Sequence, residues 1–277
     1  MALSAAPCGR RAAPYTSSPP VCVLQAAPQI LPDDATHLAL FLDVDGTLLP
    51  LAETPADVRA DANTGRLLEH LRRLHGRALA LVSGRPLGEI DRLFAPHHFA
   101  AAGQHGAEWR DAAGASGKYT AHLAELADLR RQVLRIAASD ARLLMEDKGL
   151  TLALHFRRAP ERGPELSTVL ATALAAYPAL ALQHGKCVLE IRPAGCGKDT
   201  AIRRMLNTKP FAGRRPLFVG DDVTDENGFR FINALGGFSI KVGAGASNAH
   251  YRLADPSAVR TWLAALAHVS LSEAITE

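Results

Sequence analysis

Short apolar runs alternate with segments of helical periodicity in the first part of the chain. Residues 38–44, 78–82 and 99–102 are apolar runs that end at turn residues, which predicts three buried strands. Between them, leucines from 67 to 74 and apolar residues from 90 to 94 recur at helical spacing. The succession of strand, helix, strand, helix and strand is typical of a parallel sheet.

The pattern changes in the middle of the chain. A loop rich in Gly and Ala at 111–118 predicts a domain boundary. Helical spacing follows at 123–136 and at 166–176. After each helix we predict a hairpin, the first turning around Lys148-Gly149 and the second around Gly185-Lys186. Helix, two strands, helix and two strands describe a small α+β unit.

Alternating helices and buried strands return after this unit, with predicted strands at 217–219 and 238–242. We therefore predict an α/β fold, in which a doubly wound parallel sheet is interrupted by an inserted α+β cap domain. The expected boundaries are 36–112 and 194–277 for the catalytic core, 113–193 for the cap, and 1–35 for a disordered extension rich in Ala, Pro and Ser.

Composition narrows the class of protein. The chain has 277 residues, of which 48% are hydrophobic, enough for a substantial core. The net charge of +3 is small and no long basic block occurs, so we expect no nucleic-acid partner, and no apolar run predicts a membrane contact. Its four cysteines lack metal-ligand spacing, and we interpret them as reduced thiols of a cytoplasmic protein. We expect the protein to be a monomer.

Asp43 and Asp45 end the first apolar run and are followed by Gly46-Thr47. Two carboxylates at the end of a buried strand are costly unless a cation or a reaction uses them. One carboxylate can attack as a nucleophile while the other moves a proton. The alternatives are a fragment of a calcium loop, which Leu48-Leu49-Pro50 interrupts, and an Asp-Gly turn without function.

Three further groups follow strand ends or open helices. Ser83 and its neighbouring N–H groups could hold phosphate oxygens, although a plain Ser-Gly turn also explains this residue. Lys198 could neutralise carboxylates and a phosphate, or be a solvated lysine at a helix start. Asp221, Asp222 and Asp225 belong to an acid-rich segment that suits Mg²⁺, with Thr224 or Asp225 expected to cap the next helix.

The acid pair, the serine, the lysine and the acid cluster occur in an order that resembles the haloacid dehalogenase superfamily of phosphatases. More than a hundred residues separate Ser83 from Lys198, where larger caps of that superfamily are inserted. Further stretches are similar to the trehalose-6-phosphate phosphatase family, namely Gly103-Gln104-His105-Gly106-Ala107-Glu108, Glu146-Asp147-Lys148, His155-Phe156-Arg157, Gly185-Lys186, Glu190, the Gly-Asp-Asp-x-Thr-Asp-Glu form of 220–226, and 249–253. Asp199, where Gly is usual, and Phe156, where Tyr is usual, depart from the family pattern.

The resemblance implies a mechanism. Asp43 would attack phosphorus and form an aspartyl-phosphate, while Asp45 would protonate the leaving sugar oxygen and then activate water. Mg²⁺ would be held by Asp43, Asp221 and the backbone carbonyl of Asp45. Ser83 and Lys198 would hold phosphate oxygens. The cap would close over the sugar. Asp222 and Asp225 would orient Lys198 or the water ligands of the metal.

The resemblance also implies a sugar-phosphate substrate, trehalose 6-phosphate, whose many hydroxyls need both donors and acceptors. If residues 150–158 form one strand, the alternation of side chains puts His155 and Arg157 on the same face. In the second predicted hairpin, Glu190 and Arg192 share a face for the same reason. Ordinary solvated charges that pair across a sheet are the alternative. The implied substrate-binding residues are Arg85, His105, Glu108, Glu146, Lys148, Arg157, Lys186 and Glu190.

Two other functions stay open at this point. One is a phosphatase for another sugar phosphate, such as sucrose 6-phosphate or mannosyl-phosphoglycerate. The other is a non-catalytic sugar-phosphate sensor on the same fold, although a sensor has no need of both Asp43 and Asp45.

Overall fold

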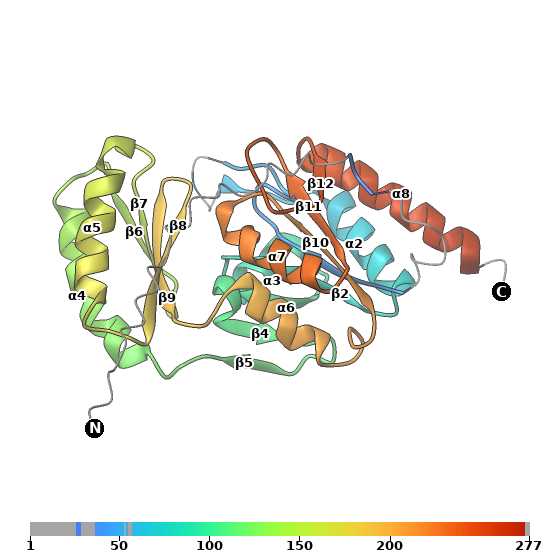
Figure 1. The fold of residues 1–277 in the computed structure, drawn as a ribbon, viewed down its shortest axis with the longest axis horizontal. Helices are drawn as coiled ribbons and strands as arrows, with labels where there is room; N and C mark the ends of the chain where they lie inside the picture. The colour runs from blue at the N-terminus through green and yellow to red at the C-terminus, as the bar shows by residue number, and fades with distance from the viewer. Residues whose placement is uncertain (1–25, 29–36, 53, 55–56, 275–277) are drawn as a thin grey trace, which may run out of the picture.

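Two β-sheets, each covered by its own helices, make up the computed structural model, which describes residues 26–28, 37–52, 54 and 57–274 (Figure 1). The predicted disordered extension lies outside the described residues except for 26–28. Among the helices of the described segments, none is long and apolar enough to cross a bilayer.

The larger sheet has eight strands in the order β12-β11-β10-β1-β2-β3-β4-β5. Neighbours from β12 to β3 pair in parallel, whereas β4 and β5 pair antiparallel. This arrangement confirms the predicted α/β class. The strands are β1 (Leu38–Leu42), β2 (Leu79–Val82), β3 (Ala100–Gly103), β4 (Glu108–Arg110), β5 (Ser116–Lys118), β10 (Arg215–Gly220), β11 (Phe238–Val242) and β12 (Tyr251–Leu253).

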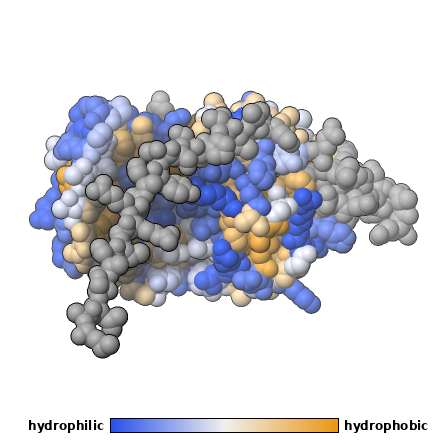
Figure 2. Space-filling view, viewed as in Figure 1, coloured by the Kyte–Doolittle hydropathy of each residue, from blue (hydrophilic) through white to orange (hydrophobic). Residues whose placement is uncertain are grey.

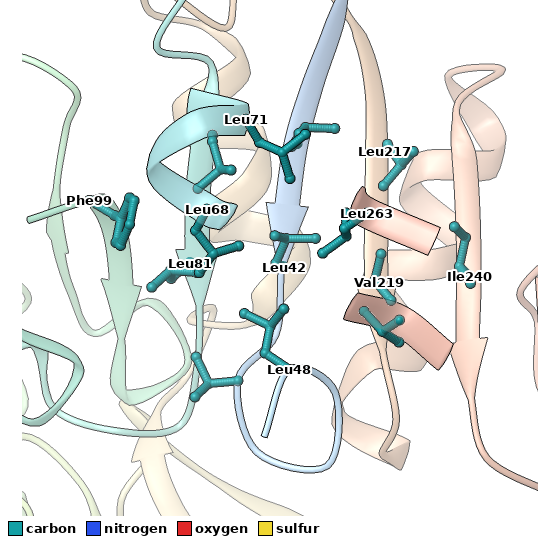
Figure 3. Close-up of a cluster of buried hydrophobic side chains, with 14 of the residues drawn as sticks. Leu42, Leu48, Leu68, Leu71, Leu81, Phe99, Leu217, Val219, Ile240 and Leu263 are labelled. Carbon is teal, nitrogen blue, oxygen red and sulfur yellow. The ribbon is translucent and has the colours of Figure 1, made fainter. Parts of the chain in front are cut away.

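Strand β1 is buried on both faces because helices cover both sides of the sheet. Leu38, Leu40 and Leu42 join one hydrophobic cluster and Ala39 and Phe41 join another, as the alternation of a strand requires. Figure 3 shows Leu42 within the first cluster. Helices α2 (Ala62–Leu74), α3 (Leu87–Phe94) and α8 (Pro256–Ala274) cover that face, and α6 (Lys198–Leu206) and α7 (Glu226–Ala234) cover the other.

Strands β4 and β5 extend the larger sheet to Lys118, beyond the predicted core boundary at residue 112. Neither strand contains an apolar run, so periodicity could not reveal them. Gly117 is needed in this hairpin, because a Cβ there would lie 2.2 Å from a ring carbon of Trp109.

The smaller sheet is antiparallel, in the order β6-β7-β9-β8, and confirms both predicted hairpins. Helices α4 (Leu123–Ala138) and α5 (Gly163–Leu174) pack on its outer face, so its other face is turned toward the larger sheet (Figure 1). Its strands are β6 (Leu144–Asp147), β7 (Leu152–His155), β8 (Leu180–Gly185) and β9 (Val188–Pro193). Because β7 ends at His155, the prediction that Arg157 shares a strand face with it was wrong.

Helix starts were predicted in part. The Asp61 carboxylate accepts a hydrogen bond from the Thr64 N–H at 2.7 Å and caps α2. Asp225, one of the two residues expected to cap the next helix, stands at the N-cap position of α7, but its side chain makes no capping hydrogen bond there. Asp222 and Asp225 instead form a reciprocal capping box around a 3-10 turn, η4 (Val223–Asp225). Asp199 lies in the first turn of α6, where a negative charge is favourable.

His75, the C-cap residue of α2, is fully buried, and neither ring nitrogen has a hydrogen-bond partner among the described residues. Burial, and then the charge of Arg214, lower the pKa of His75 from 6.5 to about 4. The unfolded chain therefore takes up this proton first as the pH falls. The stability that the neutral His75 side chain contributes is fully present above pH 6.5 and is lost as the pH falls toward 4.

We expect a His75→Leu variant to lose less stability in acid than the wild type. Between pH 7.5 and pH 5 the difference in the free energy of unfolding should change by about 2 kcal/mol. Urea unfolding at both pH values measures it, with His184→Gln, a change at an exposed histidine, as control. Equal acid sensitivity of wild type and His75→Leu would contradict the assignment.

Candidate active site

The carboxyl ends of β1, β2, β3 and β10 meet at the edge of the larger sheet that faces the smaller one, where α/β sheets bind ligands. Residues that follow β1, β2, β3 and β10 line one cavity of about 760 Å³, and residues of β6, β7, β8 and β9 complete it. On the face shown in Figure 2, hydrophilic residues gather between the two units. The cavity is large enough for a ligand of disaccharide size.

Lys198 lies between carboxylates at the base of this cavity. Its Nζ atom is 2.7 Å from Asp43 Oδ1 and 2.7 Å from Asp225 Oδ1. Carboxylate oxygens of Asp43, Asp221 and Asp225 lie within 4.8 Å of one another. Gly46, with φ of +78°, permits this approach, because a Cβ there would lie 2.2 Å from Asp221 Oδ2. Residues far apart in the sequence are therefore brought together, as predicted.

Burial affects the pKa values of Asp221, Asp43 and Lys198 in this cluster. Burial, and then the Asp225 charge, raise the pKa of Asp221 to about 6. Burial is also the main cause of a pKa of Asp43 well above its ordinary value, with Lys198 acting against it. Burial opposes the charged form of Lys198, but Asp225 and Asp43 outweigh it and raise the pKa of the ammonium group.

The donor set fits a hard divalent cation. Asp225 already uses its acceptors, because Oδ1 binds Lys198 while Oδ2 accepts the N–H groups of Asp221 at 3.0 Å and Asp222 at 2.9 Å. Asp43 and Asp221 remain as carboxylates whose mutual repulsion a cation would relieve. Thr47 connects these two, with its hydroxyl 3.1 Å from Asp43 Oδ2 and 3.3 Å from Asp221 Oδ1.

Asp45 lies beside the cluster with its carboxylate turned to Arg85. Arg85 Nε and Nη2 donate to the two oxygens at 2.6 and 2.7 Å, a bidentate pair that fixes the carboxylate plane. Glu89 holds Arg85 from its other side at 3.1 Å. Ser83 is buried and lines the cavity, and its Oγ accepts the N–H of Arg85 at 3.1 Å.

Glu190 projects from the smaller sheet into the same cavity and meets groups of both units. Its Oε2 is 2.7 Å from His105 Nε2, and its Oε1 is 3.2 Å from Lys148 Nζ. Burial opposes the ionised form, but Lys148 and His105 outweigh it and lower the pKa of Glu190. Lys148 also donates to the carbonyl of Gly84 at 3.1 Å, across the boundary between the sheets.

The other predicted substrate residues line the cavity with one exception. Glu146 bonds to His155 at 2.8 Å, Arg157 donates to the carbonyl of Ala52 at 2.9 Å, and Lys186 is exposed at the cavity wall. Glu108 alone of the predicted set lies outside the cavity lining. Its carboxylate is buried in the larger unit, which the unforeseen pairing of β4 with β3 explains.

Sequence reasoning missed Thr47, Gln104 and Thr151 as parts of the site. Thr47 and Gln104 stand inside the motifs 43–47 and 103–108, so their motif positions were a usable signal. Thr151 carried none, because a threonine after a hairpin turn is ordinary. Thr151 is fully buried and its hydroxyl is 3.0 Å from Glu190 Oε1.

A parallel sheet with an aspartate pair, a serine, a lysine and an acid cluster at its carboxyl edge defines the haloacid dehalogenase class of phosphoryl-transfer proteins. The chain belongs to the trehalose-phosphatase family, whose model matches residues 41–257.

Named relatives agree with this membership. A probable trehalose-phosphate phosphatase of Sinorhizobium fredii is 46% identical over 244 residues, 87% of this chain and 92% of the relative. The trehalose-6-phosphate phosphatase of Escherichia coli K12 is 41% identical over 234 residues, 84% and 87% of the two chains. The C-terminal domain of a C. albicans trehalose-6-phosphate phosphatase shares the fold, with a TM-score of 0.77 at 20% identity over 89% of this chain and 99% of that domain.

Proposed function

We propose that the protein is a Mg²⁺-dependent phosphatase that hydrolyses trehalose 6-phosphate to trehalose and phosphate. The observation that carries this proposal is the grouping of Lys198 with Asp43 and Asp221 at the base of a cavity lined by polar groups of both units. The names of the related proteins support trehalose 6-phosphate as the substrate.

In the first step, a carboxylate oxygen of Asp43 forms a bond to phosphorus while the bond from phosphorus to the sugar oxygen breaks. Asp45, protonated on an oxygen that has left its bidentate pair with Arg85, gives that proton to the sugar oxygen. Lys198 and Ser83 stabilise the negative charge that the phosphoryl oxygens carry in the transition state. Trehalose leaves, and the phosphoryl group stays on Asp43.

In the second step, Asp45 takes a proton from a water molecule whose oxygen attacks phosphorus. The bond from phosphorus to Asp43 breaks, which restores the carboxylate and releases phosphate. Asp225 keeps Lys198 at the reacting carboxylate during both steps, because it binds the same ammonium group as Asp43.

Asp43, Asp221 and the backbone carbonyl of Asp45 would hold Mg²⁺, and the bound cation supplies positive charge that favours ionised Asp43 and offsets the phosphate charge. Asp225 is fully engaged with Lys198 and backbone N–H groups, so it orients the site instead of binding the ion.

The smaller unit acts as a cap that reads the sugar. Glu190, Glu146 and Lys148 supply acceptors and donors for hydroxyl groups, and Arg157 and Lys186 add positive charge at the wall. We place the start of this cap after Lys118, where the larger sheet ends. The free thiols Cys187 and Cys196 support a cytoplasmic location.

Release of phosphate from a panel of sugar phosphates tests the proposal. We expect hydrolysis of trehalose 6-phosphate with Mg²⁺, its loss with EDTA, and much slower hydrolysis of sucrose 6-phosphate and mannosyl-phosphoglycerate. Preference for another member of the panel would reassign the substrate. Binding of trehalose 6-phosphate without phosphate release would identify a sensor.

Glu190→Ala is expected to lower kcat/KM for trehalose 6-phosphate by about 10²-fold, because a buried charged group that binds hydroxyls is lost. Hydrolysis of a small aryl phosphate, which does not reach Glu190, should change much less. Steady-state kinetics on both substrates measure the ratio, with Glu165→Ala, an exposed glutamate of α5, as the matched control. An equal loss on both substrates would argue against a sugar-reading role.

A further inference from the structure

Two residues outside the proposed catalytic and substrate sets, Gln104 of the larger unit and Thr151 of the cap, meet beside Glu190. Gln104 is buried in the short 3-10 turn η2 (Gln104–Gly106) after β3. Thr151 is fully buried and precedes β7 of the cap. The Thr151 hydroxyl lies 3.2 Å from Gln104 Oε1 and 3.0 Å from Glu190 Oε1.

The amide orientation of Gln104 follows from its neighbours. Glu108 Oε1 accepts the Leu87 N–H at 2.9 Å and Gln104 Nε2 at 3.0 Å. A carboxylate only accepts, so the NH₂ group of Gln104 must face Glu108 and its carbonyl must face Thr151. The amide is therefore fixed at one end before it meets the cap.

The hydroxyl of Thr151 has one hydrogen and two acceptors within reach, Gln104 Oε1 and Glu190 Oε1. Glu190 Oε1 also accepts from Lys148. When a sugar hydroxyl donates to Glu190, Thr151 can turn its hydrogen to Gln104, so that no buried acceptor loses its partner. Gln104 thus provides an alternative acceptor for the Thr151 hydroxyl when the sugar binds.

The backbone at this point is strained, which indicates that the surroundings hold it. Gln104 and His105 have φ of +47° and +55°, a left-handed region that non-glycine residues rarely adopt. The N–H groups of these residues donate to the carbonyls of Arg85 at 2.9 Å and Ser83 at 3.0 Å. The strained turn is thereby tied to the segment that also carries the partner of Asp45.

From this geometry we infer that Gln104 and Thr151 are positioning residues that set the Glu190 carboxylate relative to the catalytic edge when cap and core meet. The inference rests on the proposed function, in which Glu190 reads the sugar. It adds to that function a contact between the units. Glu108, which accepts the N–H of Leu87 in α3, fixes the Gln104 amide, and the single hydroxyl hydrogen of Thr151 is donated either to that amide or to the sugar-binding carboxylate.

The kinetic arm uses Gln104→Met, Thr151→Val, the double variant and Thr151→Ser. We expect each of the first two to lower kcat/KM for trehalose 6-phosphate about tenfold, mainly through KM, and to change hydrolysis of an aryl phosphate less than twofold. The double variant should lose no more than a single one, because both residues act through the one hydroxyl hydrogen of Thr151. Thr151→Ser keeps the hydroxyl and should retain activity, as should Thr168→Val, a control at an exposed threonine of α5.

Equal losses on both substrates, multiplicative losses in the double variant, or a Thr151→Ser variant as impaired as Thr151→Val would overturn the inference. Hydrogen exchange without substrate gives a second arm. Amides of residues 104–107 and of β9 should exchange about tenfold faster in Gln104→Met and Thr151→Val, and unchanged exchange would also overturn it. A wild type inactive on trehalose 6-phosphate would instead refute the proposed function, and the exchange arm would still decide the role of the pair.

Discussion

Asp43→Asn is expected to lower turnover of trehalose 6-phosphate by about 10⁴-fold or more, because an amide oxygen cannot form the phosphoryl intermediate. The fold should survive the change. Burial already raises the pKa of Asp43, so a neutral amide of the same shape suits the position, and Lys198 keeps its bond to Asp225.

Phosphate release and thermal unfolding of the purified variant provide the measurement for Asp43→Asn. Asp128→Asn, an exposed change on α4, is the matched control and should keep full activity. If folded Asp43→Asn retained substantial turnover after repurification, another group would have to be the nucleophile.

Lys198→Met is the second change with a large expected effect. Removing the cation leaves Asp43 and Asp225 buried without their partner, and breaking such a buried pair should cost about 3 kcal/mol of unfolding free energy. Turnover should fall by about 10³-fold, because one positive group at the phosphoryl oxygens is lost.

Urea unfolding and single-turnover kinetics separate the two effects of Lys198→Met. The stability loss is expected to shrink as the pH is lowered, since protonation of the raised-pKa carboxylates of Asp43 and Asp221 relieves their repulsion, whereas turnover should stay low. Lys209→Met, at an exposed lysine, controls for the loss of one positive charge. Unchanged turnover in Lys198→Met would place the phosphate away from this ammonium group.

The convergence of Asp43, Ser83 and Asp221 was predictable because they follow strands of one parallel sheet. The apolar runs before Asp43, Ser83 and Asp221 mark buried strands, and parallel strands present their carboxyl ends at one edge. Periodicity therefore located the groups that carry the proposed chemistry, while their roles came from the family resemblance.

Other features depend on contacts that no local pattern reveals. Glu108 turns into the larger unit because β4 pairs with β3, and β4 has no apolar alternation. Asp222 caps the turn η4 because Asp225 returns its hydrogen bond, whereas the sequence pointed to Thr224 or Asp225 as the cap. Arg157 lies beyond β7, since the strand pairs with β9 only from Leu152 to His155.

Trapping the phosphorylated intermediate tests whether the carboxylate of Asp43 accepts the phosphoryl group. The wild type is mixed briefly with trehalose 6-phosphate and Mg²⁺, quenched in acid, reduced with borohydride, and mapped by peptide mass spectrometry. An acyl phosphate on Asp43 is reduced to homoserine, so we predict homoserine at position 43 and an unmodified Asp45. Reduction at a different carboxylate, or none during steady turnover, would contradict the assignment of Asp43 as the group that accepts phosphate.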